Sequence, residues 1–330
     1  MLSIALIGCG KLGRLHAETL ARHAPGARLA AVVDPVRACA EDAAAQADGA
    51  VIAEAPDAVL RNEGIDAVVI ASPSAFHAAT VIEAARHGKH IFCEKPLALT
   101  AEDARRALDA VAAAGVKLQV GFQRRFDAAY ARAKQAIDRG EIGTVELVIS
   151  TTRDPEPNAP GYLESCGGIF LETAIHDFDS IRWLTGSEAV EVYAAASALI
   201  TTDRHGPYDI DTTAVTLRLA SGALATVTNS LRAVYGYEAG AEVFGSRGKL
   251  VISPDEGAGV QVYSPAGVAH PYPQNYAERF LAAYRAEITG FVRAIADDTR
   301  PAVTGDDGLR AVEIALAATQ SQREGRVVKV

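Results

Sequence analysis

The first third of the chain alternates between short apolar runs and stretches whose apolar residues recur at helical spacing. Such runs between helical patterns are typical of buried strands in a parallel sheet. The predicted strands are SIALI (3–7), RLAAVVD (28–34), DAVVIAS (66–72), HIFC (90–93) and VKLQV (116–120). Helices are predicted after the first run and over about 75–87 and 101–114. Strands joined by single helices predict right-handed crossovers and a parallel, doubly wound α/β sheet.

From Thr144 the pattern changes to longer strand candidates, which predicts a second domain of different character. These candidates are VELVIST (145–151), VEVYAAAS (190–197), TTAVTLRL (212–219), ALATVTNSLR (223–232), AEVFGS (241–246) and GKLVIS (248–253). Turn signals at Ser221-Gly222 and Arg247-Gly248 favour antiparallel pairing between neighbours. Helical patterns return at 277–298 and 307–323, so the second domain is predicted to be mixed α/β.

Composition and charge narrow the class of protein. The chain has 330 residues, of which 49% are hydrophobic and 22% charged, and its net charge is −9. Without a sustained Lys/Arg run, this balance argues against a nucleic-acid partner and favours a small neutral or polar substrate.

The apolar opening (2–8) is too short to span a bilayer, and no membrane association is expected. The scattered cysteines form no CxxC pair, so neither a zinc ribbon nor a disulfide framework is indicated, and a reducing cytoplasm fits best.

The sequence GCGKLG (8–13) follows the first predicted strand and precedes a helical pattern. This is GxGxxG in the context that dinucleotide binding requires. Gly8 allows a tight turn, Gly10 lets a pyrophosphate approach the backbone, and Gly13 lets helix and strand pack closely. Lys11 and Leu12 complete the loop and are expected to contact the cofactor with these glycines.

An acidic residue, Asp34, ends the second predicted strand. At this offset from the glycine motif, a carboxylate accepts hydrogen bonds from the adenosine ribose and repels a 2′-phosphate. NAD is therefore favoured over NADP. Arg37 lies near enough to meet a phosphate, so NADP stays possible; the alternative is that Arg37 faces solvent on the following helix.

Ligands of doubly wound sheets bind beyond the carboxyl ends of the strands. Three segments are therefore expected to line the cofactor cleft. They are 8–13, Ser72 to His77 (with contacts from Ser72, Pro73 and His77), and Glu94-Lys95-Pro96. Lys95 is held stiffly beside a proline at a strand end, which favours a functional lysine over an ordinary surface lysine.

The stretch GIFLETAIHDFDSIRWL (168–184) reads as a helix with an apolar face and a charged stripe. The apolar positions at helical spacing are Leu171, Ala174, Ile175, Phe178, Ile181 and Leu184. Glu172, His176 and Asp179 follow the i, i+4, i+7 pattern and are expected to share another face. That stripe is either a solvated surface or the floor of an active site.

Three stretches, GCGKLG, SPSAFHAATVIEAARHGKHIFCEKPL and GGIFLETAIHDFDSIRWL, together resemble the glucose-fructose oxidoreductase, inositol dehydrogenase and rhizopine-catabolism (Gfo/Idh/MocA) family. The resemblance covers nearly the whole chain. It implies an N-terminal Rossmann domain (1–121) and a C-terminal α/β domain (122–330) for substrate binding and oligomerisation, with a large open, mostly antiparallel sheet. It also implies that this sheet packs against another subunit, in a dimer or a homotetramer.

The resemblance assigns the chemistry to particular positions. The family's catalytic lysine falls on Lys95 and its catalytic histidine on His176. The acidic position four residues earlier, usually aspartate, is Glu172 here, and the longer side chain can reshape the substrate pocket. Glu172 or Asp179 is expected to orient the His176 imidazole.

Substrate contacts are expected from the Pro/Gly-rich loop before this helix and from the domain junction. They are Arg153 and Asn158 in RDPEPNAPGYLESCGG, and Arg124 in GFQRRFD. The alternative for these three is a structural hydrogen bond or salt bridge. Tyr235 matches the family more loosely, and its alternative is an ordinary strand aromatic.

The expected activity is NAD-dependent oxidation of a secondary hydroxyl of a cyclic polyol to a ketone, without a metal. Within the family, inositol dehydrogenases are most similar, in CEKPL, GFQRRFD and GGIFLETAIHDFD, which indicates conversion of myo- or scyllo-inositol to inosose. His176 would remove the hydroxyl proton while Lys95 stabilises the developing alkoxide. The alternatives are a dehydrogenase of an aldose, sugar acid or cyclic diol, and a catalytically silent NAD-binding regulator, which would not need to keep both residues.

Overall fold

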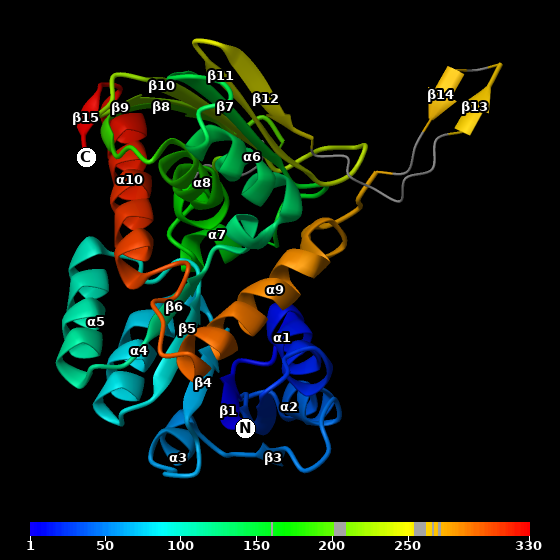
Figure 1. Ribbon diagram of the computed structural model, residues 1–330, viewed down its shortest axis with the longest axis vertical. Coiled ribbons are helices and arrows are strands. Elements are labelled where there is room, and N and C mark those ends of the chain that lie inside the picture. Colours follow the sequence, from blue (N-terminus) through cyan, green and yellow to red (C-terminus); the bar gives the residue numbers. More distant parts are fainter. Residues whose placement is uncertain (160, 201–208, 254–261, 266, 270–271) are drawn as a thin grey trace. The chain divides into compact units, whose positions relative to one another are not determined.

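The computed structural model describes residues 1–330 except 160, 201–208, 254–261, 266 and 270–271 (Figure 1). The chain forms two compact units. The first unit is Met1–Phe126 with Ala282–Val312, and the second is Asp127–Leu281 with Glu313–Val330. The first unit thus adds a distant segment of the chain to the residues predicted as domain 1–121. Among the helices described, none combines the length and the apolar character needed to cross a membrane.

The first unit is built on a six-stranded sheet with the order β3-β2-β1-β4-β5-β6, and its strand pairs are parallel. The strands are β1 (Leu2–Ile7), β2 (Ala27–Val33), β3 (Val51–Ile52), β4 (Ala67–Ile70), β5 (His90–Glu94) and β6 (Leu118–Gly121). This is the strand order of a dinucleotide-binding Rossmann fold, and it confirms the predicted doubly wound sheet. The order in which strands are added to the sheet reverses between β1 and β4, so the loops after these two parallel strands meet at the ligand-binding edge.

Helices cover both faces of this sheet. They are α1 (Lys11–Arg22), α2 (Arg37–Ala44), α3 (Pro56–Leu60), α4 (His77–Arg86), α5 (Ala101–Ala114) and α9 (Tyr276–Ala296). In Figure 1, α4 and α5 lie on one side of the strands, and α1 and α2 lie on the other. Residues Ile288 and Phe291 of α9 complete the core formed by Leu6, Leu20 and Phe92, which explains why this late segment belongs to the first unit.

The second unit contains a seven-stranded sheet with the order β12-β11-β7-β10-β9-β8-β15. The strands are β7 (Val145–Arg153), β8 (Ala189–Ser197), β9 (Thr212–Leu219), β10 (Leu224–Ser230), β11 (Glu238–Gly245), β12 (Gly248–Ile252) and β15 (Val328–Lys329). Only the β7 and β10 pair is parallel within this sheet. The prediction of a mostly antiparallel sheet is confirmed. A separate hairpin, β13 (Val262–Ser264) and β14 (Gly267–Ala269), was not predicted.

The two faces of the seven-stranded sheet differ. On one face α8 (Ile175–Thr185) packs against β7, and α6 (Ala128–Asp138) packs against α8 and β12. The C-terminal part of α10 (Gly305–Glu324) reaches β8, where the Ala194 amide donates to Ser321 Oγ at 3.0 Å. The register places another set of residues together on the opposite face, with 41–62% of each exposed: Ile149, Tyr193, Leu224, Phe244 and Val251. Apolar side chains of this number on one open face are unusual for a surface that stays in water.

Candidate active site

The glycine loop after β1 has the shape that a nucleotide phosphate requires. Gly8 has φ +95°, and a Cβ there would lie 2.4 Å from the Ser72 amide nitrogen. A Cβ on Gly13 would lie 2.1 Å from the Gly8 carbonyl oxygen, whereas one on Gly10 would meet nothing within 4 Å. Gly10 is also the N-cap of α1, without a side-chain cap. The loop therefore leaves open space at the positive end of a helix, where an anionic pyrophosphate is stabilised.

Asp34 is fixed by backbone amides at the end of β2. Its Oδ2 accepts from the Cys9 amide at 2.7 Å and its Oδ1 from the Val36 amide at 2.8 Å. Each carboxylate oxygen has a second lone pair that can accept from a ribose hydroxyl. Arg37 donates through Nε to Glu41 at 2.8 Å, and both of these side chains are more than half exposed. This surface pair corresponds to the solvent-facing alternative for Arg37.

His77 joins the loops that follow β4 and β5. Its Nε2 lies 2.7 Å from the Ser72 carbonyl oxygen and its Nδ1 lies 2.7 Å from that of Pro96. The ring is 1% exposed, and desolvation lowers the pKa of His77, opposed by the two carbonyl oxygens and by Glu94. Because both ring nitrogens are taken by these carbonyls, the observed role of His77 is to hold two of the predicted cleft segments together.

Lys95 sits at the end of β5, half-buried, between Glu94 and Pro96 in a cis Lys-Pro peptide. Glu94 is 5% exposed, and its Oε1 lies within hydrogen-bond distance of His16 Nε2, at 2.7 Å. Its carboxylate is thus engaged inside the unit, and the predicted contact of Glu94 with the cofactor stays a prediction. The turn that carries Lys95 is held from two sides, by His77 at Pro96 and by His16 at Glu94.

The stretch predicted as one helix over 168–184 begins differently. A π-helical turn, Phe170–Ala174, precedes α8 and contains Glu172. Hydrogen bonds of the i→i+5 type widen this turn, so the spacing of Glu172 and His176 is not that of a regular α-helix. Burial differs along the expected stripe, because Asp179 is 0% exposed whereas Glu172 and His176 are half-buried. Asp179 is therefore an interior residue and not part of a solvated face.

Glu172 contacts the preceding loop. Its Oε1 accepts a hydrogen bond from the Tyr162 hydroxyl at 3.1 Å, at the start of α7 (Tyr162–Ser165). Burial, followed by the nearby Glu172 charge, raises the pKa of Tyr162. Tyr162 therefore acts as a hydrogen-bond donor to the carboxylate, and it was not predicted.

Asp177, next to His176, was also missed by the sequence analysis. Its Oδ1 accepts from Ser150 Oγ at 2.7 Å, and its Oδ2 accepts from Thr152 Oγ1 and Asn229 Nδ2, both at 2.9 Å. All four side chains are at most 2% exposed. These bonds tie the first turn of α8 to β7 and β10. Polar residues at inward positions of predicted strands are the signal that would have pointed to such an anchor.

Arg153 and Tyr235 come together around Glu238, another residue that was not predicted. Arg153 Nη1 donates to Glu238 Oε2 at 2.6 Å, and the Tyr235 hydroxyl donates to the same oxygen. Partial burial and the contact with Glu238 raise the pKa of Tyr235, opposed by Arg153. Tyr235 lies in the turn before β11 and not in a strand.

The two remaining predicted substrate contacts have different surroundings. Asn158 is half-buried in the segment between β7 and α7. Arg124 is 1% exposed in the 3₁₀ turn Gln123–Phe126 of the first unit. Their predicted contacts with substrate stay predictions.

The chain matches two family descriptions in succession. Residues 2–122 match "Oxidoreductase family, NAD-binding Rossmann fold", and residues 130–251 match "GFO/IDH/MocA C-terminal domain". The chain belongs to this oxidoreductase family. The predicted family and fold class are confirmed, and the NAD-binding domain of the family is the part that carries the glycine loop and Asp34. The open space at Gly10 and the anchored Asp34 carboxylate fit that cofactor.

Full-length relatives in the Gfo/Idh/MocA family are similar across both units. The inositol 2-dehydrogenase of Rhizobium meliloti (strain 1021) is 40% identical over 326 residues, which covers 98% of each chain. The myo-inositol 2-dehydrogenase of Thermotoga maritima is 36% identical and covers 99% of this chain and 98% of its own. A crystal structure of scyllo-inositol dehydrogenase from Lactobacillus casei with bound NAD(H) and scyllo-inositol has a TM-score of 0.92 at 32% identity, covering 100% of this chain and 99% of the other.

Proposed function

We propose that this protein is an NAD-dependent inositol 2-dehydrogenase that oxidises a secondary hydroxyl of myo- or scyllo-inositol to the ketone of an inosose. The observation that carries the proposal is the 40% identity to an inositol 2-dehydrogenase over 98% of both chains. The NAD-binding loop, Lys95 at a strand end and His176 at a helix start are all present in this chain. A silent regulator would not need the last two residues.

In the proposed reaction the hydride acceptor is the nicotinamide of bound NAD. His176 accepts the hydroxyl proton, since an imidazole titrates near neutral pH. Lys95 donates a hydrogen bond to the oxygen as negative charge develops on it, and so lowers the barrier. The neighbouring anchors, Glu94 and Asp177, keep these two side chains in place and do not themselves exchange protons with the substrate.

Substrate recognition is assigned to the second unit around the Arg153 and Tyr235 pair, together with Glu172 and Asn158. Arg153 and Tyr235 are already oriented by Glu238, which lowers the entropy lost when a polyol binds. Glu172 is oriented by Tyr162 in the same way. Arg124 is proposed to act as a further contact from the first unit.

A substrate panel tests the proposal. NADH formation would be measured with myo- and scyllo-inositol, aldoses, uronic acids and a cyclic diol, and kcat/KM compared. The highest value is expected for an inositol. A higher kcat/KM for an aldose or sugar acid would show that the proposed substrate is wrong and the proposed reaction type is right. NAD binding without turnover of any of these compounds would indicate a regulator.

The open sheet face is proposed to bind a second copy of the chain, in a dimer or homotetramer. Its support is the group of exposed apolar residues on one face of the sheet, which includes Ile149, Phe244 and Val251. Analytical ultracentrifugation of the wild type and of Phe244→Asp would test this, with dissociation expected for the variant. The scattered cysteines further support the proposal that the protein works in a reducing cytoplasm.

A further inference from the structure

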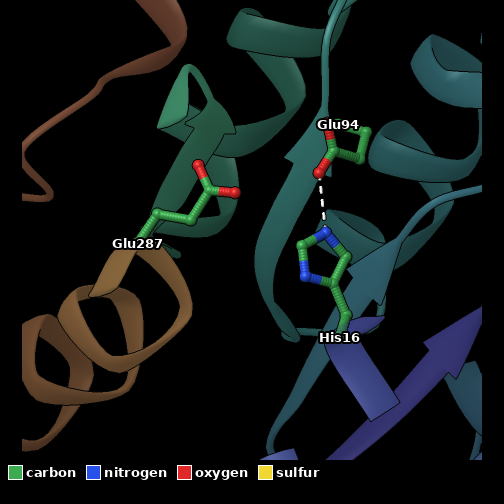
Figure 2. A group of neighbouring side chains, drawn as sticks. All are labelled: His16, Glu94 and Glu287. Carbon is green, nitrogen blue, oxygen red and sulfur yellow. Dashed lines mark hydrogen bonds and ion pairs between the residues drawn. The ribbon is translucent and has the colours of Figure 1, made fainter. Parts of the chain in front are cut away.

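Three ionisable side chains meet in the interior of the first unit, beside the strand end that carries Lys95. His16 comes from α1, Glu94 is the last residue of β5, and Glu287 comes from α9 (Figure 2). Their exposed fractions are 0%, 5% and 0%, and one ligand-type atom from each lies within 4.8 Å of the others. Segments far apart in the chain thus bring two carboxyl groups and an imidazole into one desolvated place.

His16 and Glu94 form a direct hydrogen bond, and the surroundings of the group are apolar. His16 Nε2 lies 2.7 Å from Glu94 Oε1, and when Glu94 is ionised the imidazole is the donor of this hydrogen bond. The rings of Phe92 and Tyr284 face His16 edge-on, with centroids 5.4 and 6.3 Å away. Within the described part of the chain, His16 Nδ1 and both carboxyl oxygens of Glu287 have no hydrogen-bond partner.

The charges decide how protons are shared among the three groups. If both carboxyls were ionised, the interior would hold an excess negative charge, with no described donor on Glu287, and such burial is costly. Burial, followed by the nearby Glu94 charge, raises the pKa of Glu287 well above its ordinary value. Burial and the neighbouring Glu94 charge thus favour the neutral, protonated form of Glu287 beside the His16 and Glu94 pair.

The other ionisable groups around Glu94 come from β5 and α4. Cys93 donates through Sγ to the Glu94 carbonyl oxygen at 3.3 Å, and burial raises the pKa of that thiol. His77 contacts the Pro96 carbonyl oxygen. With Lys95 itself, these groups surround the turn, and the cluster with His16 fixes its start.

Space for the Glu94 carboxylate comes from a glycine on the neighbouring strand. Glu94 and Gly121 are paired in the register of β5 and β6, and a Cβ on Gly121 would lie 2.8 Å from Glu94 Oε2. The carboxylate is thus confined between His16 and Gly121. Glu94 is the last residue of β5, so a carboxylate that is held in place there restrains the backbone from which Lys95 follows.

A proton fits the contact between His16 and Glu94 better than a metal ion does. Two atoms bound to one Zn²⁺ at its usual ligand distances are separated by about 3.4 Å in a tetrahedral site. The observed Nε2 to Oε1 distance of 2.7 Å is that of a hydrogen bond. A divalent cation would first have to separate this pair, so metal binding is an outcome of the test below.

We propose that His16, Glu94 and Glu287 are positioning residues for Lys95, forming a buried proton-sharing cluster that fixes the end of β5 and the direction of the lysine side chain. This inference rests on the proposed function for its kinetic consequences. A displacement on the order of 1 Å at a reacting group can lower turnover about a hundredfold, so a residue that never meets the substrate can control kcat.

The test compares His16→Gln and Gly121→Ala with the control Glu83→Gln, because the Glu83 side chain pairs with Arg86 on the exposed side of α4. For the first two variants we expect kcat to fall on the order of tenfold to a hundredfold. The dissociation constant for NAD should change less than about threefold, because the glycine loop is untouched. The control should retain wild-type kcat. The Glu94→Asp variant, which keeps the charge, should lose less activity than Glu94→Gln.

A second measurement does not depend on the substrate. The rate at which cyanate modifies the Lys95 amine, followed by peptide mass spectrometry over a pH series, reports the surroundings of that amine directly. The positioning role is supported if the pH profile of the Lys95 modification rate changes in His16→Gln while the melting temperature of the protein does not. This result does not require that the wild type oxidises an inositol. The two proposals can therefore fail separately.

Three results would overturn the inference. The first is an unchanged kcat and unchanged Lys95 modification in both His16→Gln and Gly121→Ala. The second is a loss of activity that merely follows unfolding, with NAD binding lost in proportion. The third is a stoichiometric divalent metal, measured by elemental analysis of the purified protein, that disappears in Glu287→Gln.

Discussion

Each of the two residues expected to carry the chemistry has a buried carboxylate as its sequence neighbour, but the two carboxylates are held differently. Glu94, before Lys95, contacts the imidazole of His16 and lies near a second carboxyl group. Asp177, after His176, accepts hydrogen bonds from hydroxyl and amide groups of three strand residues. The anchor in the first unit is built from ionisable groups, whereas the hydroxyl and amide donors of Ser150, Thr152 and Asn229 do not titrate in the ordinary pH range.

This difference separates two ways of fixing a catalytic side chain. Neutral donors around a buried carboxylate satisfy it without a matching charge, so the anchor keeps its hydrogen bonds as pH changes around neutrality. The stability of an ionisable cluster depends on how many protons it holds. A second negative charge near Glu94 would weaken the interactions within the cluster. We therefore expect the Lys95 side of the proposed site to be the more sensitive to pH.

The largest effects are expected from removing the two catalytic side chains themselves. His176→Ala should lower kcat/KM by roughly a hundredfold to ten-thousandfold near neutral pH, and Lys95→Ala by about a hundredfold or more. The deficit of His176→Ala should shrink as pH rises, because hydroxide partly replaces the missing base. Kinetics from about pH 6 to pH 10, with NAD binding measured in parallel, would check this. Full activity of either variant would remove that residue from the mechanism.

The next effect tests the anchor of neutral donors. Asp177→Ala leaves the buried donors of Ser150, Thr152 and Asn229 without their acceptor and should lower the free energy of unfolding by about 3 kcal/mol. Asp177→Asn should cost less, because the two hydroxyls can rotate to accept from the new amide. Urea unfolding would measure both losses. The loss of unfolding free energy should be nearly equal at about pH 6 and about pH 9. A strong pH dependence would show that the Asp177 anchor does not differ from the Glu94 anchor in this respect.

A smaller effect, with a defined sign, is expected at Glu287. Its pKa is raised in the folded protein by burial and by Glu94, so between the ordinary glutamate pKa and the raised value the native state binds more protons than the unfolded state. Stability therefore falls as pH rises through that window. Glu287→Gln cannot ionise, so its free energy of unfolding should decrease less than that of the wild type between about pH 5 and about pH 9. Parallel pH dependences would show that Glu287 is not buried as a neutral acid.

The Rossmann unit was predictable because its signals are local. Apolar runs, helical spacing and the GxGxxG motif lie within short stretches, and each of the five strands predicted there was found. The cluster behind Lys95 was not predictable, since His16 and Glu287 belong to ordinary helical patterns and meet only when α9 packs on the first sheet. A pair separated by hundreds of residues has no signature in the spacing of either helix.

The second unit shows a different limit. Six of its strands were found from their pattern, whereas β13, β14 and β15 were not predicted. Asp177 was missed because the helical pattern does not show which strand residues face it. The π-helical turn at Glu172 was not predicted either, because Leu171, Ala174, Ile175 and Phe178 keep regular helical spacing through it. Glu238 was missed because its partners, Arg153 and Tyr235, lie far from each other in the sequence.

The smallest expected effect concerns Glu172, whose surroundings combine both kinds of anchoring. Its carboxylate is held by the neutral Tyr162 hydroxyl, as Asp177 is held by hydroxyls, but it is half-buried and belongs to the proposed substrate site. Glu172→Asp keeps the charge and withdraws it by about one carbon–carbon bond, which lengthens the contact with Tyr162 and with any substrate hydroxyl. The ratio of kcat/KM values for myo- and scyllo-inositol should therefore change by up to about tenfold, while the larger of the two values stays within about tenfold of the wild type.

Tyr162→Phe is the matched test, because it removes the same hydrogen bond from the other side. If Glu172→Asp abolishes turnover on every polyol, and Tyr162→Phe does not, Glu172 takes part in the proton transfer and its role is chemical rather than selective.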